Sequence, residues 1–169
     1  MDILVDMSDI TFLSALELAD LIRKKELSAV ELTQHYIERI ERLDSDINAV
    51  VVRDFENARN AAQAADAALA NGDELGPLHG VPMTLKEQYH VKGLPTSFGH
   101  PELIANIPDW DSDTVVAFRN SGAILLGKTN SPIDGGDHQS YNENYGQTNN
   151  PWNLELTPGG SSGGSSAAL

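Results

Sequence analysis

Apolar positions in the first part of the chain recur at the spacing of α-helices. Residues 28–31, SAVE, form a capping box, in which the serine oxygen and the glutamate side chain satisfy the free amides at a helix start. The helix that this box opens places five apolar side chains on one face: Leu32, Tyr36, Ile37, Ile40 and Leu43. Residues 14–17, SALE, predict an earlier helix start of the same kind.

Two further elements follow these helices. Residues 48–53, NAVVVR, contain a short β-branched run and predict a strand. The apolar positions after it return to helical spacing and predict an alanine-rich helix: Phe55, Ala58, Ala62, Ala65 and Leu69.

The pattern changes near residue 72, since all 14 glycines lie at or after Gly72 and all 8 prolines at or after Pro77. Beyond this point short apolar strands alternate with turns, with a helix over residues 114–120 and a strand over 123–126. We therefore predict an α/β fold. Residues 1–71 form its helical N-terminal region, and residues 72–169 form part of a mixed β-sheet flanked by helices.

Composition and charge argue against several classes of protein. The 169 residues carry 11 basic and 25 acidic side chains, a formal net charge of −14, which disfavours nucleic-acid binding through phosphate neutralisation. No apolar run approaches the roughly 20 residues of a membrane span, so neither a nucleic acid nor a membrane is expected as a partner. The chain has no cysteine, which excludes disulfide scaffolds and thiolate sites. Residues 1–6 are acidic where a secretory signal is basic, so we expect a cytoplasmic location.

Residues 122–129, GAILLGKT, match the phosphate-binding loop pattern G-x-x-x-x-G-K-T. The context argues against that loop, which needs a strand before its first glycine and a helix opening at the Lys-Thr pair. Here a helix precedes Gly122, four apolar residues separate the glycines, and Pro132 follows too closely for a helix to have started. We interpret the run as a core strand that ends in a polar turn, with a nucleotide-binding protein as the alternative.

The second glycine-rich stretch covers residues 157–166, TPGGSSGGSS, which on composition alone could be a flexible linker. It runs into residues 167–169, AAL, which look like the first turn of a buried helix. Paired glycines around paired serines favour a tight turn that presents hydroxyls and backbone amides to a ligand.

Lys86 is the third candidate, at the end of the apolar run in residues 80–87, GVPMTLKE. Burial disfavours the charged form of a lysine and lowers its pKa, so that the neutral amine can act as a base. The alternative is a surface lysine paired with Glu87.

Metal binding is not indicated. The histidines at 35, 79, 90, 100 and 138 show no metal-ligand spacing, and residues 134–137, DGGD, lack the further oxygen ligands of a calcium loop. We expect ordinary histidines and a polar loop.

Four motifs, in their order along the chain, resemble those of a known protein family. Residues 80–87 (GVPMTLKE), 122–130 (GAILLGKTN), 145–152 (YGQTNNPW) and 158–165 (PGGSSGGS) closely resemble the amidase signature family. The helical region before residue 72 is also similar to that family's N-terminal part. The resemblance implies an incomplete amidase signature fold, a small-molecule amide as substrate, no metal or organic cofactor, and the possibility of a homodimer.

The family uses a Ser-cisSer-Lys triad, and its roles transfer to matching positions. The resemblance implies that Lys86 is the general base and Ser161 the relay serine, with a cis peptide bond at Gly160–Ser161. It also implies that Gly135 and Ser162 lie near the substrate. Residues 140–152 favour a general amidase over the transfer-RNA amidotransferase subunit.

In the family, the attacking serine and its oxyanion hole lie beyond the Gly-Ser-Ser motif, so we expect both to be absent from this chain. We thus expect the N-terminal part of an amide hydrolase acting on linear C–N bonds, inactive as residues 1–169 alone. The alternative is a non-catalytic binding or assembly module that keeps the front half of the fold.

Overall fold

The structure, a computed structural model, describes residues 10–169. Residues 1–6, on which the expected cytoplasmic location rests, lie outside the described residues. The chain forms two compact units that interleave along the sequence. The described part of the first unit comprises residues 10–38, 54–83 and 117–126, and the second comprises residues 39–53, 84–116 and 127–169. A domain boundary near residue 72 stays a prediction.

Helices α1 and α2 begin where the sequence predicts. Helix α1 (Ala15–Arg23) has the complete capping box of Ser14 and Glu17. Helix α2 (Ala29–Ile47) starts after Ser28, whose Oγ accepts a hydrogen bond from Glu31 N at 3.0 Å while Ser28 N donates to the Glu31 carboxylate at 3.1 Å. Both predicted capping boxes are therefore confirmed, because this signal depends only on residues within one turn.

Helix α3 (Phe55–Asn71) buries Ala58, Ala62 and Ala65, and it ends at Gly72, whose φ of 79° is the left-handed C-cap that glycine adopts readily. The apolar face predicted for α2 is buried at Leu32 and Ile37 but not at Leu43, which is 39% exposed. Tyr36 and Ile40 are half-buried, so the predicted helix face fails only at Leu43.

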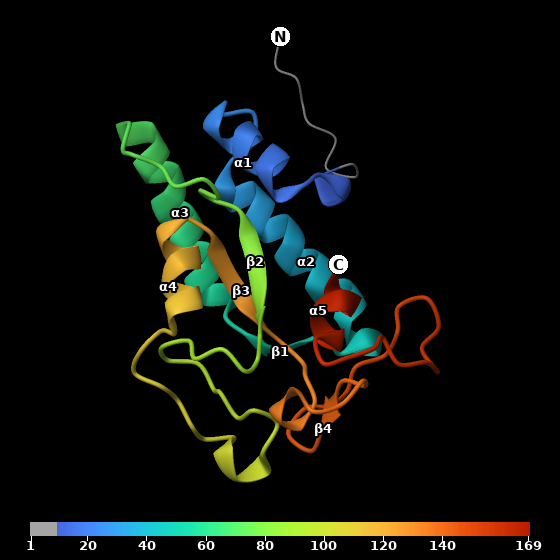
Figure 1. Cartoon of the computed structure of the whole chain (residues 1–169). Coiled ribbons are helices and arrows are strands. Elements are labelled where there is room, and N and C mark those ends of the chain that lie inside the picture. The colour runs from blue at the N-terminus through green and yellow to red at the C-terminus, as the bar shows by residue number, and fades with distance from the viewer. Residues whose placement is uncertain (1–9) are drawn as a thin grey trace. The chain divides into compact units, whose positions relative to one another are not determined.

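Three strands form one sheet in the order β1-β3-β2. Strand β1 (Val50–Arg53) pairs antiparallel with β3 (Ile124–Thr129), and β2 (Pro82–Lys86) occupies the other side of β3, as Figure 1 shows. Backbone bonds between β2 and β3 advance in the same direction, from Gly80 N to Gly122 O and from Glu87 N to Thr129 O, so these two strands run parallel. The predicted α/β class with a mixed sheet is confirmed.

Strand β3 corrects one prediction. We expected an apolar strand over residues 123–126 followed by a polar turn, but the strand continues through Thr129, and Lys128 and Thr129 are fully buried. Strand alternation explains the burial of Lys128, which follows Ile124 and Leu126 on the same face. Thr129 lies on the opposite face, where its Oγ1 hydrogen-bonds Leu85 O and Ser165 Oγ.

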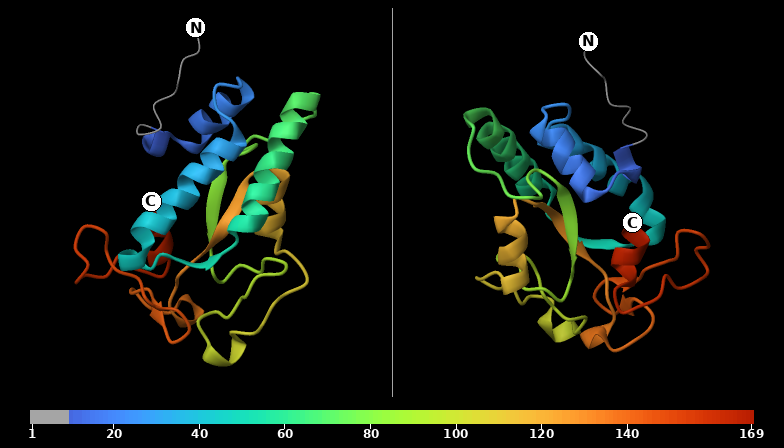
Figure 2. Two further views of the ribbon diagram at one scale, coloured as in Figure 1. Left: turned by 180° about the vertical axis from the view of Figure 1, so that it is seen from behind. Right: turned by 45° about the horizontal axis from the view of Figure 1, so that its top comes forward.

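The remaining elements are short. They comprise the 3₁₀ turns η1 (Ile10–Phe12), η2 (Pro101–Leu103) and η3 (Ile133–Gly135), helix α4 (Asp113–Asn120), the hairpin strands β4 (Tyr141–Asn142) and β5 (Gly146–Gln147), and helix α5 (Gly163–Ala168). Helix α5 packs on β1 (Figure 2). It starts four residues earlier than the helical turn predicted at residue 167, so the glycine-serine stretch is part of the folded second unit and the linker alternative is wrong.

No helix within residues 10–169 is long and apolar enough to cross a membrane.

Candidate active site

Lys86 and Ser161 are brought together across 75 positions of sequence. Lys86 is the last residue of β2, and its Nζ lies 2.8 Å from Ser161 Oγ. The lysine side chain is half-buried, and this burial lowers its pKa. A lysine with a lowered pKa in hydrogen-bond contact with a hydroxyl is an arrangement that can exchange a proton.

Ser161 lies in the turn between residue 158 and helix α5. The Gly160–Ser161 peptide bond is cis, as the resemblance implies. Gly159 precedes it with a φ of 91°, a backbone conformation that glycine adopts at little cost. Ser162 is exposed at the start of α5 and makes no capping hydrogen bond through its side chain.

Gly135 faces this pair from η3. A Cβ placed on Gly135 would lie 3.4 Å from Ser161 Oγ and 3.2 Å from Gln88 Oε1. The structure therefore brings together three of the four residues singled out from the sequence, with Ser162 beside them in the chain. Gln88 is a neighbour that the sequence did not indicate, and it lies in the turn that follows β2.

The alternative of a surface pair between Lys86 and Glu87 is wrong. Glu87 is 1% exposed, and its carboxylate accepts hydrogen bonds from Ser97 N, Ser97 Oγ and Phe98 N. Adjacent residues at a strand end point to opposite faces, which separates Lys86 from Glu87. Glu87 thus ties the loop after β2 to the strand that carries Lys86.

Lys128 is the second buried charge of this region and was not predicted as buried. Its Nζ donates hydrogen bonds to Pro95 O and, at 2.8 Å, to Thr96 Oγ1. Desolvation lowers the pKa of Lys128 to about 8, while the negative charge of Glu87 acts in the opposite direction. Because Lys128 is enclosed in a core strand, it is not placed to hold a phosphate, and the nucleotide-binding alternative has no support here.

Tyr145 is half-buried and lies next to Glu87. Its hydroxyl lies 3.5 Å from Glu87 Oε1, and burial raises its pKa to about 12. The phenol therefore stays protonated and able to donate at any physiological pH.

The polar loop predicted at residues 134–137 has a specific contact. His100 Nε2 lies 2.9 Å from Asp134 Oδ1, and this hydrogen bond raises the pKa of His100. Within the described residues, no three His, Cys, Asp or Glu side chains are placed to hold a metal ion.

The sequence model of the family described as Amidase matches residues 31–169. This chain belongs to the amidase signature family. It is 42% identical over 163 residues to a glutamyl-tRNA(Gln) amidotransferase subunit of Acidothermus cellulolyticus, covering 96% of this chain and 32% of that protein. The chain therefore spans about a third of the length of the curated relatives it matches.

Solved structures of amidase signature enzymes have the same fold. A fatty acid amide hydrolase matches with a TM-score of 0.90 and 32% identity, over 97% of this chain and 30% of that one. A bacterial aryl acylamidase of the amidase signature family matches with a TM-score of 0.86 and 33% identity, over 92% of this chain and 32% of that one. The fold expected from the resemblance is thus confirmed as part of an amidase signature fold.

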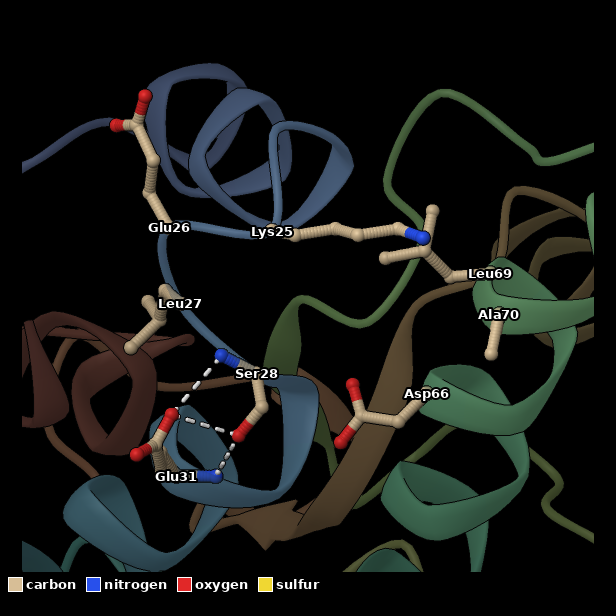
Figure 3. Close-up of a pocket in the computed structure, with 8 residues that line it drawn as sticks. All are labelled: Lys25, Glu26, Leu27, Ser28, Glu31, Asp66, Leu69 and Ala70. Atoms are coloured by element: carbon tan, nitrogen blue, oxygen red, sulfur yellow. Dashed lines mark hydrogen bonds between the residues drawn. The ribbon is translucent and has the colours of Figure 1, made fainter. Parts of the chain in front are cut away.

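A pocket of about 320 Å³ lies elsewhere in this amidase signature chain, entirely within the first unit (Figure 3). Its walls are the α1–α2 connection and one face of α3, and they include the Ser28–Glu31 capping box. The Asp66 carboxylate is already occupied, because it accepts hydrogen bonds from Ala29 N at 2.8 Å and Val30 N at 3.2 Å. The pocket shares no residue with the Lys86–Ser161 pair, and three of its polar residues, Ser28, Glu31 and Asp66, cap α2.

Lys128 gives a testable pH dependence of stability. An unfolded chain keeps this lysine protonated up to about pH 10.4, whereas in the folded chain its pKa is about 8. Between these values the unfolded state binds more protons, so the contribution of Lys128 to the free energy of unfolding rises with pH. Urea denaturation from pH 7 to 10 is expected to show wild type gaining stability relative to Lys128→Met above pH 8.

The exposed Lys92 supplies the matched control for this measurement, and Lys92→Met is expected to show no such trend. A difference between wild type and Lys128→Met that is constant across the pH range contradicts the buried, shifted lysine.

Proposed function

We propose that this chain supplies the general base and the relay serine of an amide hydrolase. The observation that carries the proposal is the 2.8 Å contact between Lys86 Nζ and Ser161 Oγ, with a lysine whose pKa is lowered by burial. Membership of the amidase signature family supports the same roles for Lys86 and Ser161.

In the proposed reaction, neutral Lys86 accepts the proton of Ser161 as Ser161 takes the proton of an attacking serine. That serine adds to the amide carbonyl, the C–N bond breaks, and the relay returns the proton to the departing amine or ammonia. The product is an acyl-enzyme, and water then releases the carboxylic acid by the same relay. The proposal places the attacking serine and the oxyanion hole outside residues 1–169, as the resemblance implies.

Gly135 and Ser162 are proposed as substrate-side residues. The backbone of Gly135 approaches the relay closely, since a Cβ there would lie 3.2 Å from Gln88 Oε1 and 3.4 Å from Ser161 Oγ, and Ser162 is exposed beside the relay. A small amide is the substrate class that this proposal names. The possible homodimer stays a prediction.

The test is an assay for ammonia or amine release from a panel of small amides. It compares residues 1–169 alone with the chain extended by whatever coding sequence follows Leu169. Turnover by the extended protein that is lost in Lys86→Ala supports the proposal. Turnover that survives Lys86→Ala overturns it, and binding of amides with no turnover by any form favours the non-catalytic module.

A second candidate is an amidotransferase subunit, favoured by the 42% identity to a protein of that name compared with 32% to the fatty acid amide hydrolase. This candidate runs against the preference for a general amidase derived from residues 140–152. It predicts that ammonia release depends on partner subunits and on a glutamyl-tRNA acceptor. Ammonia release that is equal with and without them would leave the general amide hydrolase as the function.

A further inference from the structure

One hydroxyl joins the two ends of the turn that carries Ser161. Ser140 is fully buried, and its Oγ donates to Gly159 O at 3.2 Å and accepts from Gly163 N at 2.8 Å. These two backbone groups lie two residues before and two residues after Ser161. A single atom, Ser140 Oγ, therefore links the two ends of the turn through hydrogen bonds.

The turn also lies directly on the segment that contains Ser140. A Cβ on Gly160 would lie 2.6 Å from Asp137 O and 2.8 Å from Gln139 N, and a Cβ on Gly163 would lie 2.9 Å from Ser140 Cβ. Side chains do not fit at these separations, so both positions require glycine. Because glycine brings no side chain to fix the turn, polar contacts must do so.

Ser140 is itself held in place. Its carbonyl accepts a hydrogen bond from Thr148 N at 2.9 Å, and Thr148 Oγ1 donates to Asn48 O at 2.7 Å. The residue thus connects the Ser161 turn to the β4–β5 hairpin region.

We propose that Ser140 is a positioning residue for the relay serine, which keeps Ser161 Oγ within hydrogen-bond distance of Lys86 Nζ. This inference rests on the proposed function. Ser140→Ala removes the shared atom, which leaves the buried Gly163 N and the half-buried Gly159 O without that partner.

The experiment follows the Lys86 side chain and the Gly163 amide by NMR in the 169-residue chain. In Ser140→Ala, exchange of the Gly163 amide proton is expected to accelerate about 10-fold, as one lost hydrogen bond implies. The Lys86 Cε resonance is expected to move toward its position in Ser161→Ala. The matched control is Ser131→Ala, because Ser131 is equally buried and its Oγ has no hydrogen-bond partner, so neither signal should change.

A kinetic measurement on whichever form shows turnover adds a second readout. Ser140→Ala is expected to lower kcat by about 10- to 100-fold while KM changes little, since misplacing the relay affects the chemical step. If Ser140→Ala does not fold, Ser140→Cys fills the same space with a weaker hydrogen-bonding atom and should give smaller changes of the same kind.

The outcomes separate this inference from the proposed function. A Lys86 resonance that stays in place while the Gly163 amide exchanges faster overturns the inference, because the turn would then loosen without affecting the relay. Dependence of the Lys86 resonance on Ser140 in a protein that hydrolyses no amide supports the positioning role and refutes only the proposed function.

Discussion

Replacement of Lys86 by alanine is expected to lower kcat/KM for amide hydrolysis by about 10³-fold or more. Lys86 Nζ contacts Ser161 Oγ and is the base of the proposed relay, so removal of the amine leaves the attacking serine without a base. Ser161→Ala should cause a loss of similar size. Because the two residues act as one relay, the double variant is expected to lose little more than either single variant. Steady-state kinetics on the form that shows turnover measures all three losses.

Lys92→Ala is the control for these variants, since this exposed lysine lies six positions further along and has no place in the proposed relay. It should keep wild-type kinetics. Losses that multiply in the Lys86→Ala, Ser161→Ala double variant would contradict a shared relay.

Replacement of Glu87 by leucine is expected to destabilise the fold by about 3–5 kcal/mol, which is the usual cost of removing one partner from a buried charged group. The substitution leaves Ser97 N, Ser97 Oγ and Phe98 N without their acceptor and leaves Lys128 without a compensating negative charge. Chemical denaturation of the two proteins at pH 7 gives the difference directly.

The additional replacement of Lys128 by methionine should recover part of this loss, because it removes the uncompensated charge. Glu155→Leu is the matched control at an exposed glutamate and should change stability by less than about 0.5 kcal/mol. A loss from Glu87→Leu no larger than that of Glu155→Leu would show that Glu87 does not anchor the loop.

The parts of the fold that could be predicted depend on signals within a few residues. Ser14 and Ser28 mark helix starts because each satisfies backbone amides of its own first turn. Gly72 marks the end of α3 because the left-handed C-cap is a local requirement. The pairing of Lys86 with Ser161 was accessible only through the order of four motifs, since nothing in either segment alone indicates the other.

The remaining features depend on contacts between distant segments. Lys128 looks like a turn residue from its neighbours, yet it is enclosed because Pro95 and Thr96 provide oxygen atoms for its ammonium group. Ser140 lies in a polar run with no distinguishing pattern, and its contacts are made 19 and 23 residues further along the chain. Sequence periodicity indicates which face of a helix or strand is buried. It does not indicate which hydrogen-bond partner a polar side chain on that face will have.

The most direct measurement of the central claim changes the basicity of residue 86 alone. The chain has no cysteine, so Lys86→Cys places a single thiol within residues 1–169, and alkylation with bromoethylamine restores a lysine-like side chain with a less basic amine. The assay uses the extended form that shows turnover, with wild type treated with the same reagent as the control. If Lys86 is the base, the unalkylated variant is inactive, alkylation restores turnover, and the rising limb of the kcat/KM profile moves to lower pH than in the treated wild type. Activity that does not depend on alkylation, or a restored profile with an unmoved rising limb, would contradict Lys86 as the base.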